Sequence, residues 1–122
     1  MDILLGMGGS ADSRLALRET VSALATVDDR LTVAILRDAR SDTTVEELET
    51  LIETTASEAG LPVEIVVLDG NPGPALTDLA ESDGYDQIVI GGGKRSPMGK
   101  ISLGEITEFV VLNADTTVTL VR

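Results

Sequence analysis

The basic residues of this chain gather in one glycine-rich segment. Lys94, Arg95 and Lys100 make up a third of the nine lysines and arginines, and they stand beside four glycines in residues 91–100. Glycines allow backbone N–H groups to approach a ligand closely, and the segment precedes a predicted helix whose N-terminus favours anions. This combination predicts an anion site, above all for phosphate. The alternative is an ordinary surface loop whose glycines only permit a turn.

The chain lacks the side chains that most enzymes use for acid–base and nucleophilic chemistry. It contains no histidine and no cysteine, which removes the commonest general base, the thiol nucleophile and the commonest metal ligands. The four glutamates in residues 46–53 are spread around a predicted helix, as on a solvated face. We therefore expect a binding protein rather than an enzyme, with slow hydrolysis of a bound ligand as the most that it catalyses.

The charge balance excludes several classes of partner. Asp and Glu number 21 against 9 Lys and Arg, a net charge of −12. Such a surface repels phosphate backbones and anionic lipids, so we expect neither nucleic acid nor a membrane as partner. The acidic excess has two explanations, ordinary solubility or a salt-rich cytosol in which ions screen the repulsion. We hypothesise the second, a halophilic protein. No apolar run reaches the length of a membrane span and no secretory signal opens the chain, so we expect a cytoplasmic location.

Hydrophobic patterning alternates between strands and helices. Short apolar runs predict strands at residues 2–7, 31–36, 63–68, 87–90 and 116–121. The clearest predicted helix follows Thr44, whose spacing to Glu47 is that of a capping box. The last predicted helix runs from about Ser102 to Leu112, and Asn113 is expected to end it in a left-handed conformation.

This order predicts an α/β fold in which a doubly wound, five-stranded parallel sheet carries helices on both faces. In such sheets the ligand crevice lies at the carboxyl ends of the strands. Here that edge collects the turns after Met7, Leu36 and Ile90.

Three stretches of the sequence resemble the universal stress protein family. Residues 91–122 look like its C-terminal signature, with glycines at Gly91 and Gly104 and a closing phrase from Asn113 to Val121. Residues 3–10 resemble the family's opening strand and turn, and residues 70–76 its Gly-x-Pro turn before the third helix. The resemblance covers residues 1–122 as one domain. It implies a Rossmann-like, nucleotide-binding α-hydrolase-like fold with strand order 3-2-1-4-5.

The resemblance also implies a nucleotide site at the Gly91–Thr107 loop. We expect this segment to fold back, so that its main-chain amides line a cleft at the carboxyl rim of the sheet. Thr107 matches a hydroxyl that contacts phosphate in the family, and Leu36 and Ile90 match apolar contacts to the adenosine. The expected cofactor-binding residues are Met7, Gly8, Leu36, Ile90, Gly91, Lys94, Gly104, Glu105, Ile106 and Thr107.

Three of these positions depart from the family's pattern. Lys94 stands where the second motif glycine is expected, Glu105 replaces a serine or threonine that contacts phosphate, and Gly8 replaces an aspartate near the nucleotide. A carboxylate at Glu105 repels a phosphate unless a cation bridges them, whereas Lys94 can meet a phosphate directly as a flexible point charge.

Two functions therefore remain open. The first is a stress-response module that binds ATP or another adenine nucleotide, with Mg²⁺ if ATP binds. The second is a universal stress protein that binds no nucleotide and acts as a dimeric interaction or signalling module. In both we expect a symmetric homodimer, because Thr116 to Val121 form an unpaired edge strand and family members commonly pair this strand antiparallel with its symmetry mate.

Overall fold

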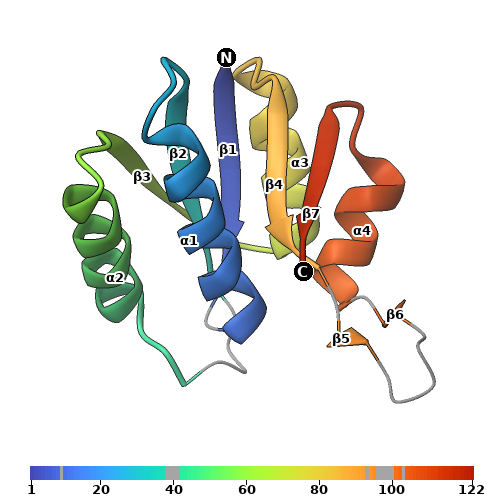
Figure 1. Ribbon diagram of the computed structural model, residues 1–122. Coiled ribbons are helices and arrows are strands. Elements are labelled where there is room, and N and C mark those ends of the chain that lie inside the picture. Colours follow the sequence, from blue (N-terminus) through green and yellow to red (C-terminus); the bar gives the residue numbers. More distant parts are fainter. Residues whose placement is uncertain (9, 38–41, 93, 96–100, 103) are drawn as a thin grey trace.

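The computed structural model describes residues 1–8, 10–37, 42–92, 94–95, 101–102 and 104–122 (Figure 1). Five parallel strands form its central sheet: β1 (Asp2–Met7), β2 (Arg30–Leu36), β3 (Val63–Leu68), β4 (Gln87–Gly91) and β7 (Thr117–Val121). Their order across the sheet is β3-β2-β1-β4-β7, which confirms the fold predicted from the sequence. The remaining strands, β5 (Lys94–Arg95) and β6 (Ile101–Ser102), pair antiparallel as a separate two-stranded sheet.

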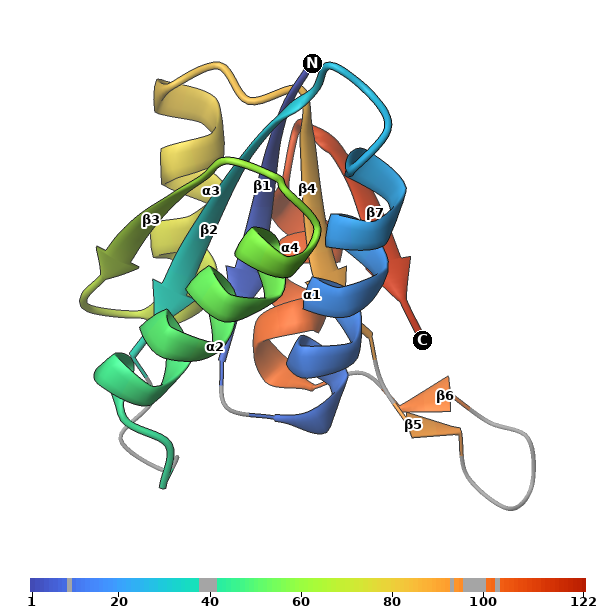
Figure 2. The same cartoon turned by 60° about the vertical axis from the view of Figure 1, so that its left-hand side comes forward.

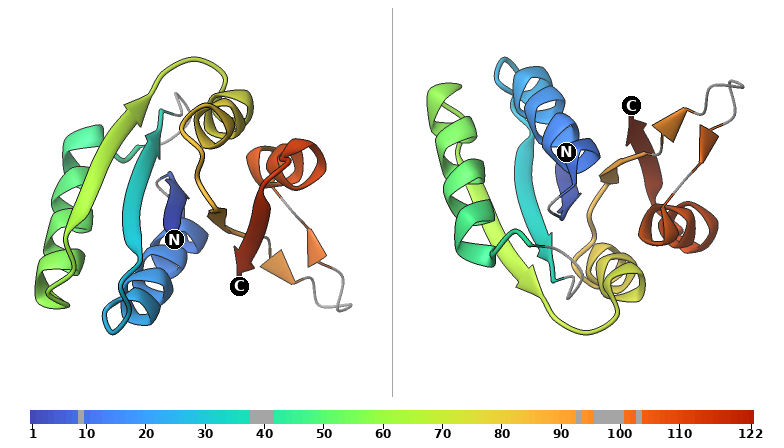
Figure 3. Two further views of the ribbon diagram at one scale, coloured as in Figure 1. Left: turned by 90° about the horizontal axis from the view of Figure 1, so that it is seen from above. Right: turned by 90° about the horizontal axis from the view of Figure 1, so that it is seen from below.

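Helices cover both faces of the sheet, as Figures 2 and 3 show. Helices α1 (Ala11–Leu24) and α2 (Val45–Glu58) bury one face, where Leu5, Leu17 and Ile52 belong to one apolar core cluster. Helices α3 (Pro72–Ser82) and α4 (Glu105–Asn113) bury the other, where Leu4, Leu76 and Val110 belong to a second cluster. Successive residues of a strand point to opposite faces, so both cores are built mainly from aliphatic side chains of the same strands.

The predicted start of α2 is confirmed, because the Thr44 hydroxyl accepts a hydrogen bond from the Glu47 N–H at 3.1 Å. Two expectations for the last helix are wrong. The helix begins at Glu105, because Ser102 lies in β6 and Gly104 takes an extended conformation as the N-cap. Asn113 is not left-handed, since no described residue other than glycine has a positive φ. Its side-chain amide instead donates to the Phe109 carbonyl oxygen at 2.8 Å.

None of the helices in the described part of the chain is long and apolar enough to cross a membrane.

Candidate functional site

Three elements meet at Gly91, the last residue of β4. A Cβ built on Gly91 would lie 2.5 Å from the Asp12 carbonyl oxygen, so the end of β4 touches the first turn of α1. The Thr107 hydroxyl, on the first turn of α4, donates a 2.9 Å hydrogen bond to the Gly91 carbonyl oxygen. The N-termini of α1 and α4 are thus both anchored at the carboxyl rim of the sheet. Helix N-termini carry partial positive charge, so this rim favours an anion.

The described residues of the turn after β1 form hydrogen bonds with one another. The Ser10 hydroxyl caps α1 by accepting from the Ser13 N–H at 3.1 Å, and it donates to the Ser13 hydroxyl at 3.2 Å. The Ser13 oxygen in turn accepts from the Gly8 N–H at 3.1 Å. The Gly8 amide is therefore engaged within the turn rather than directed at a ligand.

The first turn of α4 differs, because no side chain caps it. Its N-cap is Gly104, and a Cβ built there would meet no atom of the described residues within 4 Å. Glu105 follows as the first helical residue and places a carboxylate at the positive end of the helix. This helix start thus combines an N-cap residue that has no side chain with a carboxylate on the first helical residue.

The apolar residues predicted for the site divide between the two faces of the sheet. Leu36 and Ile90 lie in the core cluster beneath α3 and α4, and Ile106 packs against it. Met7 lies in the cluster beneath α1 and α2 and is fully buried. The structure therefore brings Leu36, Ile90 and Ile106 together but places Met7 on the opposite face.

The basic segment lies to one side of the rim. Figures 1 and 2 show β5 and β6 projecting outward beside β7 and the start of α4, away from the ends of β1 and β2. The expected folding of this segment over the crevice is not observed for these two strands. Lys94 and Arg95 form β5, whereas Lys100 lies outside the described residues.

A basic residue that the sequence reasoning missed lies at the same edge. Arg37 directly follows β2, and its Nε is 2.9 Å from Asp69 Oδ1 after β3. Both side chains are more than half exposed, so the pair is screened by solvent and Arg37 remains accessible to an anion. The signal that could have identified Arg37 is its position immediately after a strand of the predicted parallel sheet.

The described residues provide no ready-made metal site, since no group of three or more histidine, cysteine, aspartate or glutamate side chains is placed to hold an ion. A magnesium ion at this rim would depend on oxygens that the nucleotide brings.

These features define an α/β protein with a doubly wound sheet whose carboxyl rim carries the N-termini of α1 and α4. A family profile described as the universal stress protein family matches residues 1–122, and the chain belongs to that family.

Solved structures of universal stress proteins share the fold. One from Archaeoglobus fulgidus superposes with a TM-score of 0.78 at 22% identity, covering 100% of this chain and 98% of that chain. An A. fulgidus protein in complex with dAMP gives 0.71 at 18% identity, covering 100% and 98%. An Arabidopsis thaliana family protein with AMP bound gives 0.71 at 16% identity, covering 99% and 90%. Comparison with curated proteins gives no match.

Proposed function

We propose that this chain binds an adenine nucleotide at the carboxyl rim, with the phosphates at the N-terminus of α4. The observation that carries the proposal is the convergence of two helix N-termini on Gly91, fixed by the Thr107 hydrogen bond and the contact with Asp12. Backbone N–H groups and helix dipoles together favour phosphate. Relatives with the same fold are described in complex with dAMP and with AMP, which supports the adenine nucleotide class.

Within this class, ATP with Mg²⁺ is the ligand that we propose to test first. Arg37, an exposed basic residue directly after β2, supplies a cation at the rim for a longer phosphate chain. The adenosine is expected against Leu36 and Ile90, which share one core cluster beside α3 and α4.

The alternative is a family member that binds no nucleotide and acts as a dimeric interaction module. Two observations favour it. Glu105 places a carboxylate where an anion would bind, and the Thr107 hydroxyl already gives its proton to Gly91. A hydroxyl that donates to the backbone has no second proton for a phosphate oxygen.

Calorimetric titration with Mg-ATP, ATP and AMP separates the two functions. If nucleotide binds, Arg37→Ala weakens binding by about 1–3 kcal/mol, as expected for the loss of a charge-assisted contact. Glu105→Ser strengthens binding by removing the competing charge. Glu108→Ser is the matched control, because it removes one carboxylate from the same turn of α4. Absence of heat and of thermal shift at millimolar nucleotide decides for the alternative.

We also propose a homodimer formed through β7. In the sheet order β7 pairs with β4 on one side and ends the sheet on the other. The Gly92 N–H donates to the Val121 carbonyl oxygen at 2.9 Å. Since backbone groups alternate along a strand, Val118 and Leu120 direct their N–H and C=O groups toward the open edge. An antiparallel copy of β7 is a matching partner for these groups.

A further inference from the structure

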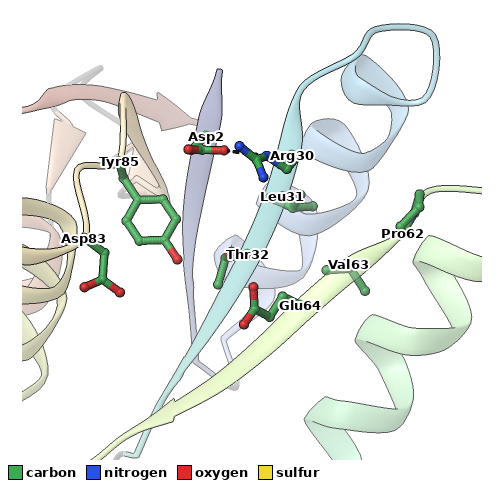
Figure 4. A pocket seen from close by; sticks show the side chains of 9 residues that line it. All are labelled: Asp2, Arg30, Leu31, Thr32, Pro62, Val63, Glu64, Asp83 and Tyr85. Carbon is green, nitrogen blue, oxygen red and sulfur yellow. Dashed lines mark ion pairs between the residues drawn. The ribbon is translucent and has the colours of Figure 1, made fainter.

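A cavity lies at the rim of the sheet where the strands begin, opposite the carboxyl rim. Its volume is about 690 Å³. The lining residues come from the starts of β1, β2 and β3 and from the turn between α3 and β4: Asp2, Arg30, Leu31, Thr32, Pro62, Val63, Glu64, Asp83 and Tyr85 (Figure 4). The nucleotide site proposed above lies at the carboxyl ends of the same strands, so the two sites are separated by the length of the sheet.

The end of α3 fixes the position of Tyr85 in this cavity. Gly84 has a φ of 68°, which reverses the chain at the helix end. The Tyr85 N–H then donates to the Ala80 carbonyl oxygen at 3.0 Å. Figure 4 shows the Tyr85 ring reaching toward Thr32 and Glu64, so three polar side chains point into one space.

Thr32 is the residue that marks the cavity as a site. It is only 6% exposed, yet its side chain lines the cavity. Its hydroxyl makes no hydrogen bond to any described residue. The Thr32 oxygen is therefore not fully buried, because every fully buried side-chain oxygen of the described residues has a partner. The hydroxyl therefore faces the cavity. It is available to a ligand, because a polar group in a largely buried residue normally has a hydrogen-bond partner.

The charges around the cavity favour a cation. Arg30 is neutralised by Asp2, since its Nε lies 3.0 Å from Asp2 Oδ1. Glu64 and Asp83 form no ion pair with any described residue, which leaves two negative charges at the cavity. Asp83 is also the C-cap of α3, where the helix dipole adds partial negative charge.

We propose that this cavity binds a small organic cation with one or two primary ammonium groups. Glu64 and Asp83 pair with the ammonium groups, the Thr32 hydroxyl accepts a hydrogen bond, and the Tyr85 ring packs against the ligand through cation–π contact. An organic ion fits better than a bare metal ion, because the space is large and the described residues hold no group of three carboxylates placed to bind a metal.

Tyrosine fluorescence tests this proposal at the site itself. Tyr85 is the single tyrosine and the chain has no tryptophan, so its emission reports on this cavity alone. Putrescine is titrated at about 0.15 M salt, where nonspecific attraction to a charged surface is screened beyond about 8 Å. We expect a saturable change with putrescine and none with 1,4-butanediol, its uncharged counterpart.

Variants distinguish binding in the cavity from nonspecific attraction to the acidic surface of the protein. Glu64→Gln with Asp83→Asn should weaken putrescine binding at least about tenfold, the equivalent of one lost charge-assisted contact. Thr32→Val should weaken it to a smaller extent. The control is Glu19→Gln with Glu53→Gln, which removes the same charge from exposed positions of α1 and α2 and should leave binding unchanged. Circular dichroism confirms that each variant is folded.

Three results overturn the proposal. One is the absence of saturation at about 10 mM putrescine, a concentration that exceeds a millimolar Kd about tenfold. Another is equal weakening in the cavity variant and in the control, which would assign the binding to net charge. The third is equal binding of the diol, which would remove the role of the ammonium groups.

Discussion

The Thr107 hydroxyl lies 2.9 Å from the Gly91 carbonyl oxygen and donates a hydrogen bond to it. This bond joins the first turn of α4 to the last residue of β4. Thr107 is only 7% exposed, so the bond is shielded from water. The geometry of the proposed nucleotide site therefore depends on a side chain that the family resemblance assigns to the ligand.

Replacing Thr107 tests this structural role. Thr107→Val keeps the shape and leaves the buried Gly91 carbonyl without its partner, which should lower the free energy of unfolding by about 1–3 kcal/mol. Urea unfolding followed by circular dichroism measures the change. Thr107→Ser keeps the hydroxyl and should lose less. Equal losses in the two variants would show that the methyl group, and not the hydrogen bond, stabilises this contact.

The close approach of Gly91 to α1 predicts a steric requirement for glycine. In Gly91→Ala the new Cβ would lie 2.5 Å from the Asp12 carbonyl oxygen, and backbone atoms must shift to make room. We expect a loss of about 1–3 kcal/mol in unfolding free energy, as for other overpacked positions. Gly104→Ser is the control, because a Cβ there meets no described residue within 4 Å and serine is a favoured N-cap. If both variants unfold at the same urea concentration, the contact between Gly91 and α1 accommodates an added methyl group and the steric requirement for glycine is contradicted.

The turn after β1 predicts a difference between its two serines. Ser13→Ala removes the oxygen that accepts from the Gly8 N–H, and also the partner of the Ser10 hydroxyl. It should cost about 1–3 kcal/mol because Ser13 is buried. Ser10→Ala removes an exposed helix cap and should cost about 1 kcal/mol. Amide hydrogen exchange at Gly8 provides the second measurement, since exchange should accelerate in Ser13→Ala more than in Ser10→Ala.

The sequence predicted the sheet and its helices because these depend on local patterns. Apolar runs of four to six residues mark the strands, and the Thr44 cap marks the start of α2. The start of α4 was misjudged because Ser102 pairs with Lys94 across a short hairpin, a contact between residues that the local pattern does not connect. The predicted left-handed conformation of Asn113 was wrong for a similar reason, since its side-chain amide donates to the helix backbone instead.

The candidate sites were predicted less completely than the fold. The meeting of the turns after Met7 and Ile90 at the carboxyl rim was expected from the order of strands and helices, whereas the hydrogen bonds of Thr107 and Ser13 to the backbone depend on side-chain geometry. The cavity around Thr32 was missed, because its residues come from three strand starts and one turn. Each of them is an ordinary residue in its own element, and only the sheet register places Thr32 beside Glu64.

The proposed dimer predicts that a charge on the middle of β7 prevents association. Thr119 is exposed near the centre of the strand, and in an antiparallel pair of identical strands it lies close to its own copy. Thr119→Glu therefore brings two like charges together and should raise the dissociation constant by about tenfold or more. Thr54→Glu, at an exposed position of α2, is the control. Sizing with light scattering measures both. A wild-type monomer at micromolar concentration would contradict the dimer itself.

The acidic surface predicts that salt stabilises the fold. The net charge of −12 causes repulsion between carboxylates, which is stronger in the folded state because the charges are closer together. Raising KCl from about 0.1 M to about 1 M shortens the screening length from about 10 Å to about 3 Å. The melting temperature should therefore rise, by about 4 °C for each 1 kcal/mol of relieved repulsion at this chain length. The triple variant Glu19→Gln, Glu46→Gln and Glu53→Gln lowers the net charge from −12 to −9 and should show a smaller rise. A melting temperature that is independent of KCl, or that rises equally in the variant, would mean that the acidic excess serves solubility and is not an adaptation to salt.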